Sequence, residues 1–105
     1  MHNKSPLSTK TLEQLFTEAR TFSAWEQKTI DPNVLTELYD LVKFGPTSAN
    51  CSPMRLLFLV SDEAKARLIP TLSKANRSKS QTAGAVAIIA YDTEFYEELP
   101  RLFPH

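Results

Sequence analysis

Two short apolar runs constrain the fold of this chain more than any other feature. They are "LLFLV" at 56–60 and "AVAIIAY" at 85–91, and continuous apolar runs of this length are typical of strands buried on both faces. Such strands need helices on both sides of their sheet, and two strands alone are too few for a stable sheet. We therefore expect both runs in one sheet, which gains further strands from a missing C-terminal part or from a partner chain.

Helices are predicted around these strands from the spacing of apolar residues and from capping residues. The first runs from Ser8 to Arg20, the second from Asp31-Pro32 to a stop at Gly45-Pro46, the third from Ser61 to a kink or end at Pro70, and a short last one is capped by Asp92. The predicted order is helix, helix, strand, helix, strand, helix. This pattern indicates an α+β fold, with residues 73–80 left as a loop.

Composition narrows the class of protein. A length of 105 residues suits one small domain, and 42% apolar residues can form a core. Twelve basic and twelve acidic side chains cancel, which argues against nucleic-acid or membrane-surface binding. No apolar run approaches the roughly 20 residues of a membrane span, and a single cysteine fits a reducing cytoplasm. We expect a cytoplasmic protein, and the apolar ending "ELPRLFPH" suggests a chain that is cut there.

A short connector between the second helix and the first strand contains the segment Pro46–Asn50, "PTSAN". Thr47, Ser48 and Asn50 offer hydrogen-bond donors and acceptors without charge. This set suits a neutral heterocycle with alternating donors and acceptors at its edge. It equally suits an ordinary turn, and the segment alone favours the turn.

Two basic features, Arg20 and the run at 73–80, are further candidates for ligand binding. Arg20, followed by Thr21, suits a phosphate, although a cation after a helix also stabilises the helix dipole. The run "SKANRSKS" at 73–80, with Asn76 and Lys79, has no acid and suits a phosphate or a ring oxygen. A solvated basic loop is the alternative interpretation.

Other classes of site lack support. Two glycines leave no room for a phosphate-binding glycine-rich loop. His2 and His105 stand at the two ends, so neither a catalytic triad nor a zinc site is expected. Cys51 has no histidine nearby in sequence, which favours a packed thiol over a reactive one. We therefore predict no metal ligands and no catalytic side chain.

Taken together, these clusters resemble the nitroreductase family of flavin enzymes, and the resemblance is best to its malonic semialdehyde reductase-like branch. It covers nearly the whole chain from residue 10 on, and the segment "GPTSANCSPMR" is quite specific. The residues that carry it are "ARTFSAW" (19–25), "LYDLVKFGPTSANCSPMRLLFLV" (38–60), "EAKARLIPTLSKANRSKS" (63–80) and "FYEELPRLFPH" (95–105).

The resemblance implies an α+β nitroreductase-like fold, a homodimer, and an FMN site shared between the subunits. Arg20 matches the arginine that meets the FMN phosphate, with Thr21 as its hydroxyl neighbour. Pro46, Thr47, Ser48 and Asn50 match the segment that reaches the flavin from the other subunit, and Asn76 and Lys79 match residues at the flavin ring. This sequence differs from many family members at two places. Phe22 and Ala24 stand where many members have polar or basic phosphate contacts, and Ser52 and Met54 stand where many have a glutamine and a tryptophan.

The implied activity is that of an FMN-dependent oxidoreductase with NADPH or NADH as co-substrate. Hydride passes through flavin N5 in a ping-pong reaction to a small aldehyde, such as malonic semialdehyde, which becomes 3-hydroxypropionate, or to a nitro or quinone-type acceptor. Because family members are roughly twice as long, residues 1–105 are expected to be the N-terminal half of one domain, with little activity alone. The alternative is a truncated, flavin-free fold module that self-associates.

Overall fold

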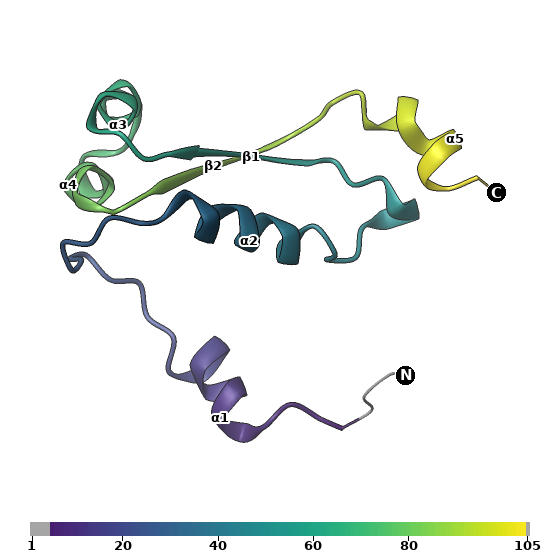
Figure 1. The fold of residues 1–105 in the computed structure, drawn as a ribbon, viewed down its shortest axis with the longest axis horizontal. Coiled ribbons are helices and arrows are strands. Elements are labelled where there is room, and N and C mark those ends of the chain that lie inside the picture. Colours follow the sequence, from purple (N-terminus) through teal and green to yellow (C-terminus); the bar gives the residue numbers. More distant parts are fainter. Residues whose placement is uncertain (1–4, 105) are drawn as a thin grey trace.

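The computed structural model describes residues 5–104, so His2 and His105 lie outside the described residues. Two strands form the centre, and helices lie on both sides of them and at both ends (Figure 1). The elements are α1 (Thr9–Leu12) continued by a π-helical turn (Glu13–Thr17), α2 (Pro32–Val42), a 3₁₀ turn (Ser48–Asn50), β1 (Met54–Leu59), α3 (Asp62–Leu68), a 3₁₀ turn (Ile69–Thr71), α4 (Lys74–Thr82), β2 (Val86–Tyr91), a 3₁₀ turn (Phe95–Glu98) and α5 (Leu99–Leu102).

The two strands pair antiparallel in one sheet, with Met54 opposite Tyr91 and Leu59 opposite Val86. The prediction that both apolar runs share a sheet is confirmed. Within the described chain the sheet has these two strands. Each strand has two faces of alternating residues, and both faces are rich in apolar side chains.

Helices cover both faces of the sheet in part. Met54 lies with Tyr39 and Val42 of α2 around one hollow, and Figure 1 shows α2 running alongside the strands. On the other face, Leu57 and Ile88 line a hollow with residues of α3. The helix–sheet–helix layering expected from the apolar runs is therefore present.

Three of the predicted helix starts are confirmed by their caps. The Ser8 Oγ accepts from Thr11 N at 3.1 Å, Asp31 Oδ1 accepts from Asn33 N at 2.9 Å, and Ser61 Oγ accepts from Ala64 N at 3.1 Å. Each of these bonds satisfies an amide that a helix otherwise leaves unpaired at its first turn. The predicted starts of these three helices are therefore correct.

Three other predictions are corrected by the structure. Residues 74–82 form the helix α4 rather than a basic loop. The first helix ends in a π-helical turn at Thr17, before Arg20. Asp92 accepts a hydrogen bond from Glu94 N at 2.8 Å, but the last helical turns begin only at Phe95.

Tertiary hydrogen bonds explain why a polar sequence is helical in α4. Lys65 of α3 is buried, and its Nζ donates to Gln81 O at 3.1 Å and to Ala83 O at 2.9 Å. Carbonyls at a helix end have no partner within the helix, and a cation there also complements the helix dipole. Sequence patterns do not show such a partner from another helix.

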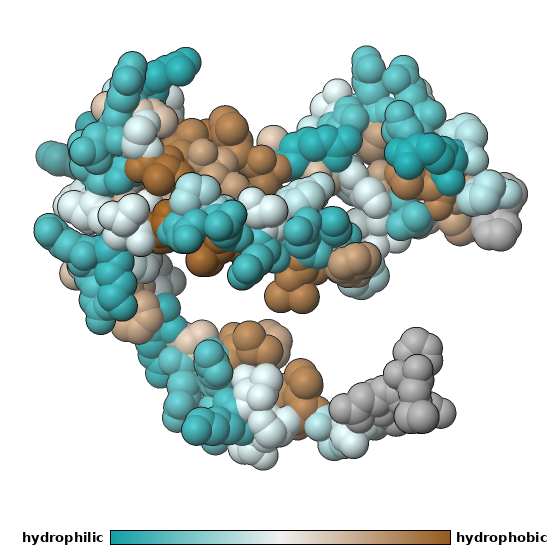
Figure 2. All heavy atoms as spheres, in the orientation of Figure 1, coloured by the Kyte–Doolittle hydropathy of each residue, from teal (hydrophilic) through white to brown (hydrophobic). Residues whose placement is uncertain are grey.

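The chain buries little apolar surface by itself. Among the described residues, Ala83 and Lys65 are the buried ones. Large apolar side chains such as Phe44, Leu41 and Ile89 are 80%, 73% and 75% exposed. Figure 2 shows hydrophobic surface over the middle of the sheet and on the sides of α1 and α2 that face each other. None of the helices in residues 5–104 is long and apolar enough to cross a membrane.

Candidate functional site

A hollow of about 350 Å³ lies between the loop after α1, the helix α4 and the start of β2. Thr21 lines it from the loop, and Asn76 and Lys79 line it from α4. Residues from two of the three polar clusters predicted from the sequence therefore meet in one place, although Arg20 is not among them. The other lining residues are Phe22, Trp25, Leu72, Ser80, Ala83, Ala85, Val86 and Ala87.

The chemistry of this hollow is apolar and cationic. Lys79 is its one cation, Thr21, Asn76 and Ser80 supply hydroxyl and amide groups, and no carboxylate is among the lining residues. Small aliphatic side chains from the start of β2 complete the wall. A site of this composition favours a planar, apolar ligand that carries polar edges or negative charge.

Trp25 joins the loop to α4. Its Nε1 donates to Lys79 O at 2.8 Å, although 54 positions separate the two residues in the chain. The bond holds the loop that carries Thr21 against the helix that carries Asn76. Sequence reasoning did not single out Trp25, although it lies within the "ARTFSAW" segment.

Arg20 does not point into this hollow. Its Nη1 donates to Thr17 O at 3.2 Å and to Ala19 O at 2.7 Å. The guanidinium thus binds carbonyls at the end of the π-helical turn, as the helix-dipole alternative predicted. Arg20 lines a neighbouring hollow together with Glu13 and Glu18.

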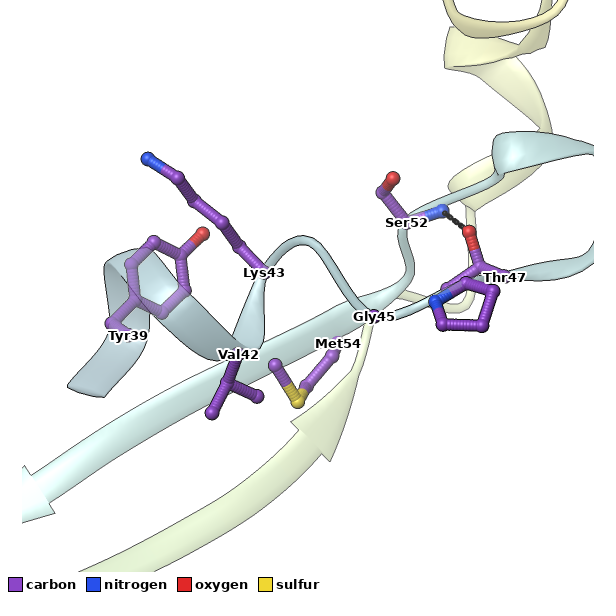
Figure 3. A pocket seen from close by; sticks show the side chains of 8 residues that line it. Tyr39, Val42, Lys43, Gly45, Thr47, Ser52 and Met54 are labelled. Carbon is purple, nitrogen blue, oxygen red and sulfur yellow. Dashed lines mark hydrogen bonds between the residues drawn. The ribbon is translucent and has the colours of Figure 1, made fainter. Parts of the chain in front are cut away.

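The segment Pro46–Asn50 lies elsewhere in the chain. Pro46 and Thr47 line a hollow of about 200 Å³ with residues of α2 and with Ser52 and Met54 (Figure 3). Thr47 Oγ1 accepts from Ser52 N at 3.1 Å. The predicted segment is therefore a folded turn between α2 and the start of β1, with its first two residues at a hollow.

Ser48 and Asn50 form the 3₁₀ turn of this segment. Asn50 Nδ2 donates to Leu102 O at 2.8 Å, so part of its amide is used within the chain. Ala49, Asn50 and Ser52 have φ values of 49°, 52° and 45°. Positive φ is uncommon outside glycine, and it follows from no pattern in the sequence.

The helix α2 separates the two hollows. The loop before α2 contacts the α4 end of the sheet, because a Cβ on Gly84 would lie 2.9 Å from Ile30 Cγ1. The segment Pro46–Asn50 follows the other end of α2 (Figure 1). Within one chain, the sequence-predicted residues thus divide into Thr21, Asn76 and Lys79 in one hollow, Pro46 and Thr47 in another, and Arg20, Ser48 and Asn50 outside both.

A cation lies at the second hollow, which sequence reasoning also did not single out. Lys43 Nζ is 3.1 Å from Asp40 Oδ1 and lies 5.9 Å and 5.6 Å from the ring centres of Tyr39 and Phe44. Cations favour such positions over aromatic rings. Since Lys43 is already paired, the second hollow is less cationic than its lining residues suggest.

No protein-family model matches the chain. Its sequence is 54% identical over 99 residues to a protein of Burkholderia lata named "Putative NADH dehydrogenase/NAD(P)H nitroreductase", covering 94% of this chain and 51% of that protein. The chain thus spans about half the length of this relative.

A solved structure shares the fold. The crystal structure of a "putative nitroreductase in complex with FMN" from Exiguobacterium sibiricum superposes with a TM-score of 0.76 at 26% sequence identity. The match covers 91% of this chain and 45% of that one. The α+β fold of this chain is therefore nitroreductase-like.

Proposed function

We propose that this chain is the N-terminal half of a nitroreductase-family oxidoreductase that uses FMN and NAD(P)H. The hollow that brings Thr21 together with Asn76 and Lys79 is the observation that carries the proposal. Two independent similarities support it: the name of the Burkholderia lata relative and the FMN in the Exiguobacterium structure. Both matches involve about half of a longer protein.

The residues of the hollow fit a flavin. Its volume of about 350 Å³ lies within the usual range for small-molecule sites. Asn76 and Lys79 offer donors at one wall, and the absence of a carboxylate among the lining residues favours a ring that gains negative charge on reduction. When bound, the flavin supplies the hydride chemistry between the nicotinamide and the acceptor.

Four residues of this chain have a defined role in the proposed binding of FMN. Lys79 stabilises negative charge at the ring edge, Asn76 orients the ring, and Thr21 binds close to the phosphate. Arg20 binds the phosphate, which requires its Nη1 to exchange the carbonyls of Thr17 and Ala19 for phosphate oxygens. A phosphate carries full negative charge and accepts two parallel bonds from one guanidinium, which favours this exchange over the neutral carbonyls.

We further propose that the complete protein is a homodimer with a shared site. The segment Pro46–Asn50 follows the end of α2 that lies away from α4 (Figure 1). Lys79 is on α4, so one chain does not enclose a ligand with both sets of residues. A second copy of the chain would supply the segment Pro46–Asn50 to the hollow that Lys79 lines. The exposed apolar side chains of the sheet and of α2 favour such an association.

The substrate in this proposal is a small aldehyde such as malonic semialdehyde, or a nitro or quinone-type acceptor. The resemblance of "GPTSANCSPMR" to the malonic semialdehyde reductase-like branch supports the aldehyde. Ser52 and Met54 line the hollow beside Thr47, so they are in place to shape a substrate space. A cytoplasmic location belongs to the same proposal.

The test is oxidation of NADPH and NADH with added FMN and malonic semialdehyde. Three proteins are compared: this chain, the Burkholderia lata relative, and this chain fused to the part of that relative that it does not match. We expect turnover by the fusion and little by the chain, because hydride transfer needs a closed, water-poor site. Turnover by the chain equal to that of the fusion would show that residues 1–105 suffice.

A flavin-free module that self-associates is the second candidate. The bonds of Arg20 to the carbonyls of Thr17 and Ala19 and the exposed apolar surface favour it. The absorbance band of bound flavin separates the two candidates. A fusion protein that self-associates and purifies without that band, even after incubation with FMN, would support the module and contradict the enzyme.

A further inference from the structure

The turn between α2 and β1 is held in an unfavourable backbone conformation. Ala49, Asn50 and Ser52 all have φ between 45° and 52°, a left-handed region that asparagine tolerates but alanine and serine rarely adopt. Conformations of this kind persist only where surrounding contacts hold them in place. The contacts that hold this turn therefore determine where Pro46–Asn50 lies.

Arg55, the second residue of β1, makes one of these contacts and also joins the turn to the segment after β2. Its Nη1 donates to Ser52 O at 3.0 Å and to Met54 O at 2.9 Å. Its Nη2 donates to Asp92 Oδ2 at 3.2 Å. One guanidinium thus connects the last strained residue of the turn to the residue that follows β2.

Asp92 completes the connection from the other side. Its amide N donates to Pro53 O at 2.8 Å, and its Oδ1 accepts from Glu94 N at 2.8 Å. Its side chain is 35% exposed, so solvent competes only in part for the carboxylate. The segment after β2 is fixed by the same carboxylate that binds Arg55.

A second bond ties the turn to the same C-terminal segment. Asn50 Nδ2 donates to Leu102 O at the end of α5, at 2.8 Å. The turn is thus held at Asn50 by α5, at Ser52 by Thr47 and by Arg55, and at Pro53 by the backbone amide of Asp92. No bond to Thr21, Asn76 or Lys79 is among these contacts.

We infer that Arg55 and Asp92 are positioning residues, which hold the turn Pro46–Pro53 in the conformation that it needs to meet its ligand. Neither side chain lines the hollow beside Thr47, so they act through the backbone of the turn. The part of this inference that concerns FMN rests on the proposed function. The part that concerns the conformation of the turn does not.

The inference is tested first without a ligand, by hydrogen exchange of the amides within residues 46–53, which are those of 47–52 because both ends are prolines, followed by mass spectrometry or NMR. Asp92→Asn keeps an oxygen for Glu94 N but replaces the acceptor of Arg55. We expect exchange in 46–53 to become about two- to five-fold faster, as for the loss of one partly exposed ion pair. Glu26→Gln is the matched control, since it removes an exposed carboxylate from an ion pair with Lys28 far from the turn.

The second measurement is the affinity of the fusion protein for FMN, followed by flavin fluorescence. We expect Asp92→Asn and Arg55→Lys each to weaken binding about two- to five-fold, and the double variant to be no weaker than either single one. The urea midpoint of unfolding should change little, which separates positioning from general stability. Glu26→Gln should bind FMN as the unchanged protein does.

The outcomes distinguish the two proposals. Unchanged exchange rates in 46–53 for Asp92→Asn overturn the inference, whatever the protein binds. Faster exchange in a fusion protein that binds no FMN supports the role of the pair in the turn and contradicts the proposed function. Additive effects of Asp92→Asn and Arg55→Lys on affinity would show that the two residues do not act together.

Discussion

Replacing Lys65 by methionine should destabilise the fold more than any exposed lysine substitution. The Lys65 side chain is 7% exposed, and its Nζ donates to Gln81 O and Ala83 O. Methionine keeps most of the length of the side chain but leaves both carbonyls without this donor. An unsatisfied buried polar group costs about 1–3 kcal/mol. Because solvent can partly satisfy the less buried Gln81 O, we expect the free energy of unfolding to fall by roughly 2–4 kcal/mol for the two carbonyls together.

The contribution of the nearby ion pair is small by comparison. Asp62 Oδ1 lies 3.6 Å from Lys65 Nζ, and the Asp62 side chain is 95% exposed. Exposed pairs contribute at most about 1 kcal/mol. Asp62→Asn should therefore lower the free energy of unfolding by at most about 1 kcal/mol, although it removes the opposite charge.

Urea unfolding followed by far-UV circular dichroism measures both variants. For a domain of this size the dependence on urea is about 1–3 kcal/mol per molar, so Lys65→Met should lower the midpoint by roughly 1–2 M. Lys74→Met, on the exposed first turn of α4, is the matched control and should shift it little. If Lys65→Met and Lys74→Met had equal midpoints, or if Asp62→Asn were as damaging as Lys65→Met, the reasoning from the two carbonyls would be refuted.

Three further predictions concern the cofactor, the packing and the assembly. Arg20→Ala should weaken FMN binding by the complete protein by about tenfold to a thousandfold, as for a truncated charge pair; unchanged affinity in a fluorescence titration would support the helix-dipole role. Gly84→Ala should lower the urea midpoint through a loss of about 1–3 kcal/mol, because its Cβ would lie 2.9 Å from Ile30 Cγ1; an unchanged midpoint would show that Ile30 moves freely. Light scattering should give the chain a mass above its monomer mass of 11.8 kDa, and Ile89→Lys on the exposed sheet should lower it; a compact monomer would contradict this.

The fold could be predicted from the sequence where local rules decide it. Asp31-Pro32 and Ser61 located helix starts because capping is a local interaction, and the apolar runs located both strands within two residues. The helix α4 could not be predicted in this way. Its sequence has few apolar residues, and the partner of its last carbonyls is Lys65, which lies on another helix.

The membership of the candidate site stays a prediction, and its arrangement did not follow from the sequence. Thr21, Asn76 and Lys79 came from the family resemblance, and the structure places them in one hollow. The bond from Trp25 to Lys79 O that holds this hollow together joins distant segments. The positive φ of Ser52 accompanies bonds of its backbone to Thr47 Oγ1 and to Arg55 Nη1, and no residue-by-residue preference reveals such bonds.

The contact of Lys65 with the end of α4 also has a consequence for the order of folding. β1 and β2 pair across the whole of α3 and α4, and contacts between distant segments form more slowly than local helices. Lys65 lies near the start of the segment that connects the two strands, and Ala83 lies just before β2. Their bond closes a short helical hairpin, which brings the start of β2 back beside the end of β1 and leaves a smaller loop to close. Lys65→Met should thus slow refolding as well as speed unfolding, with the slower refolding visible in stopped-flow kinetics.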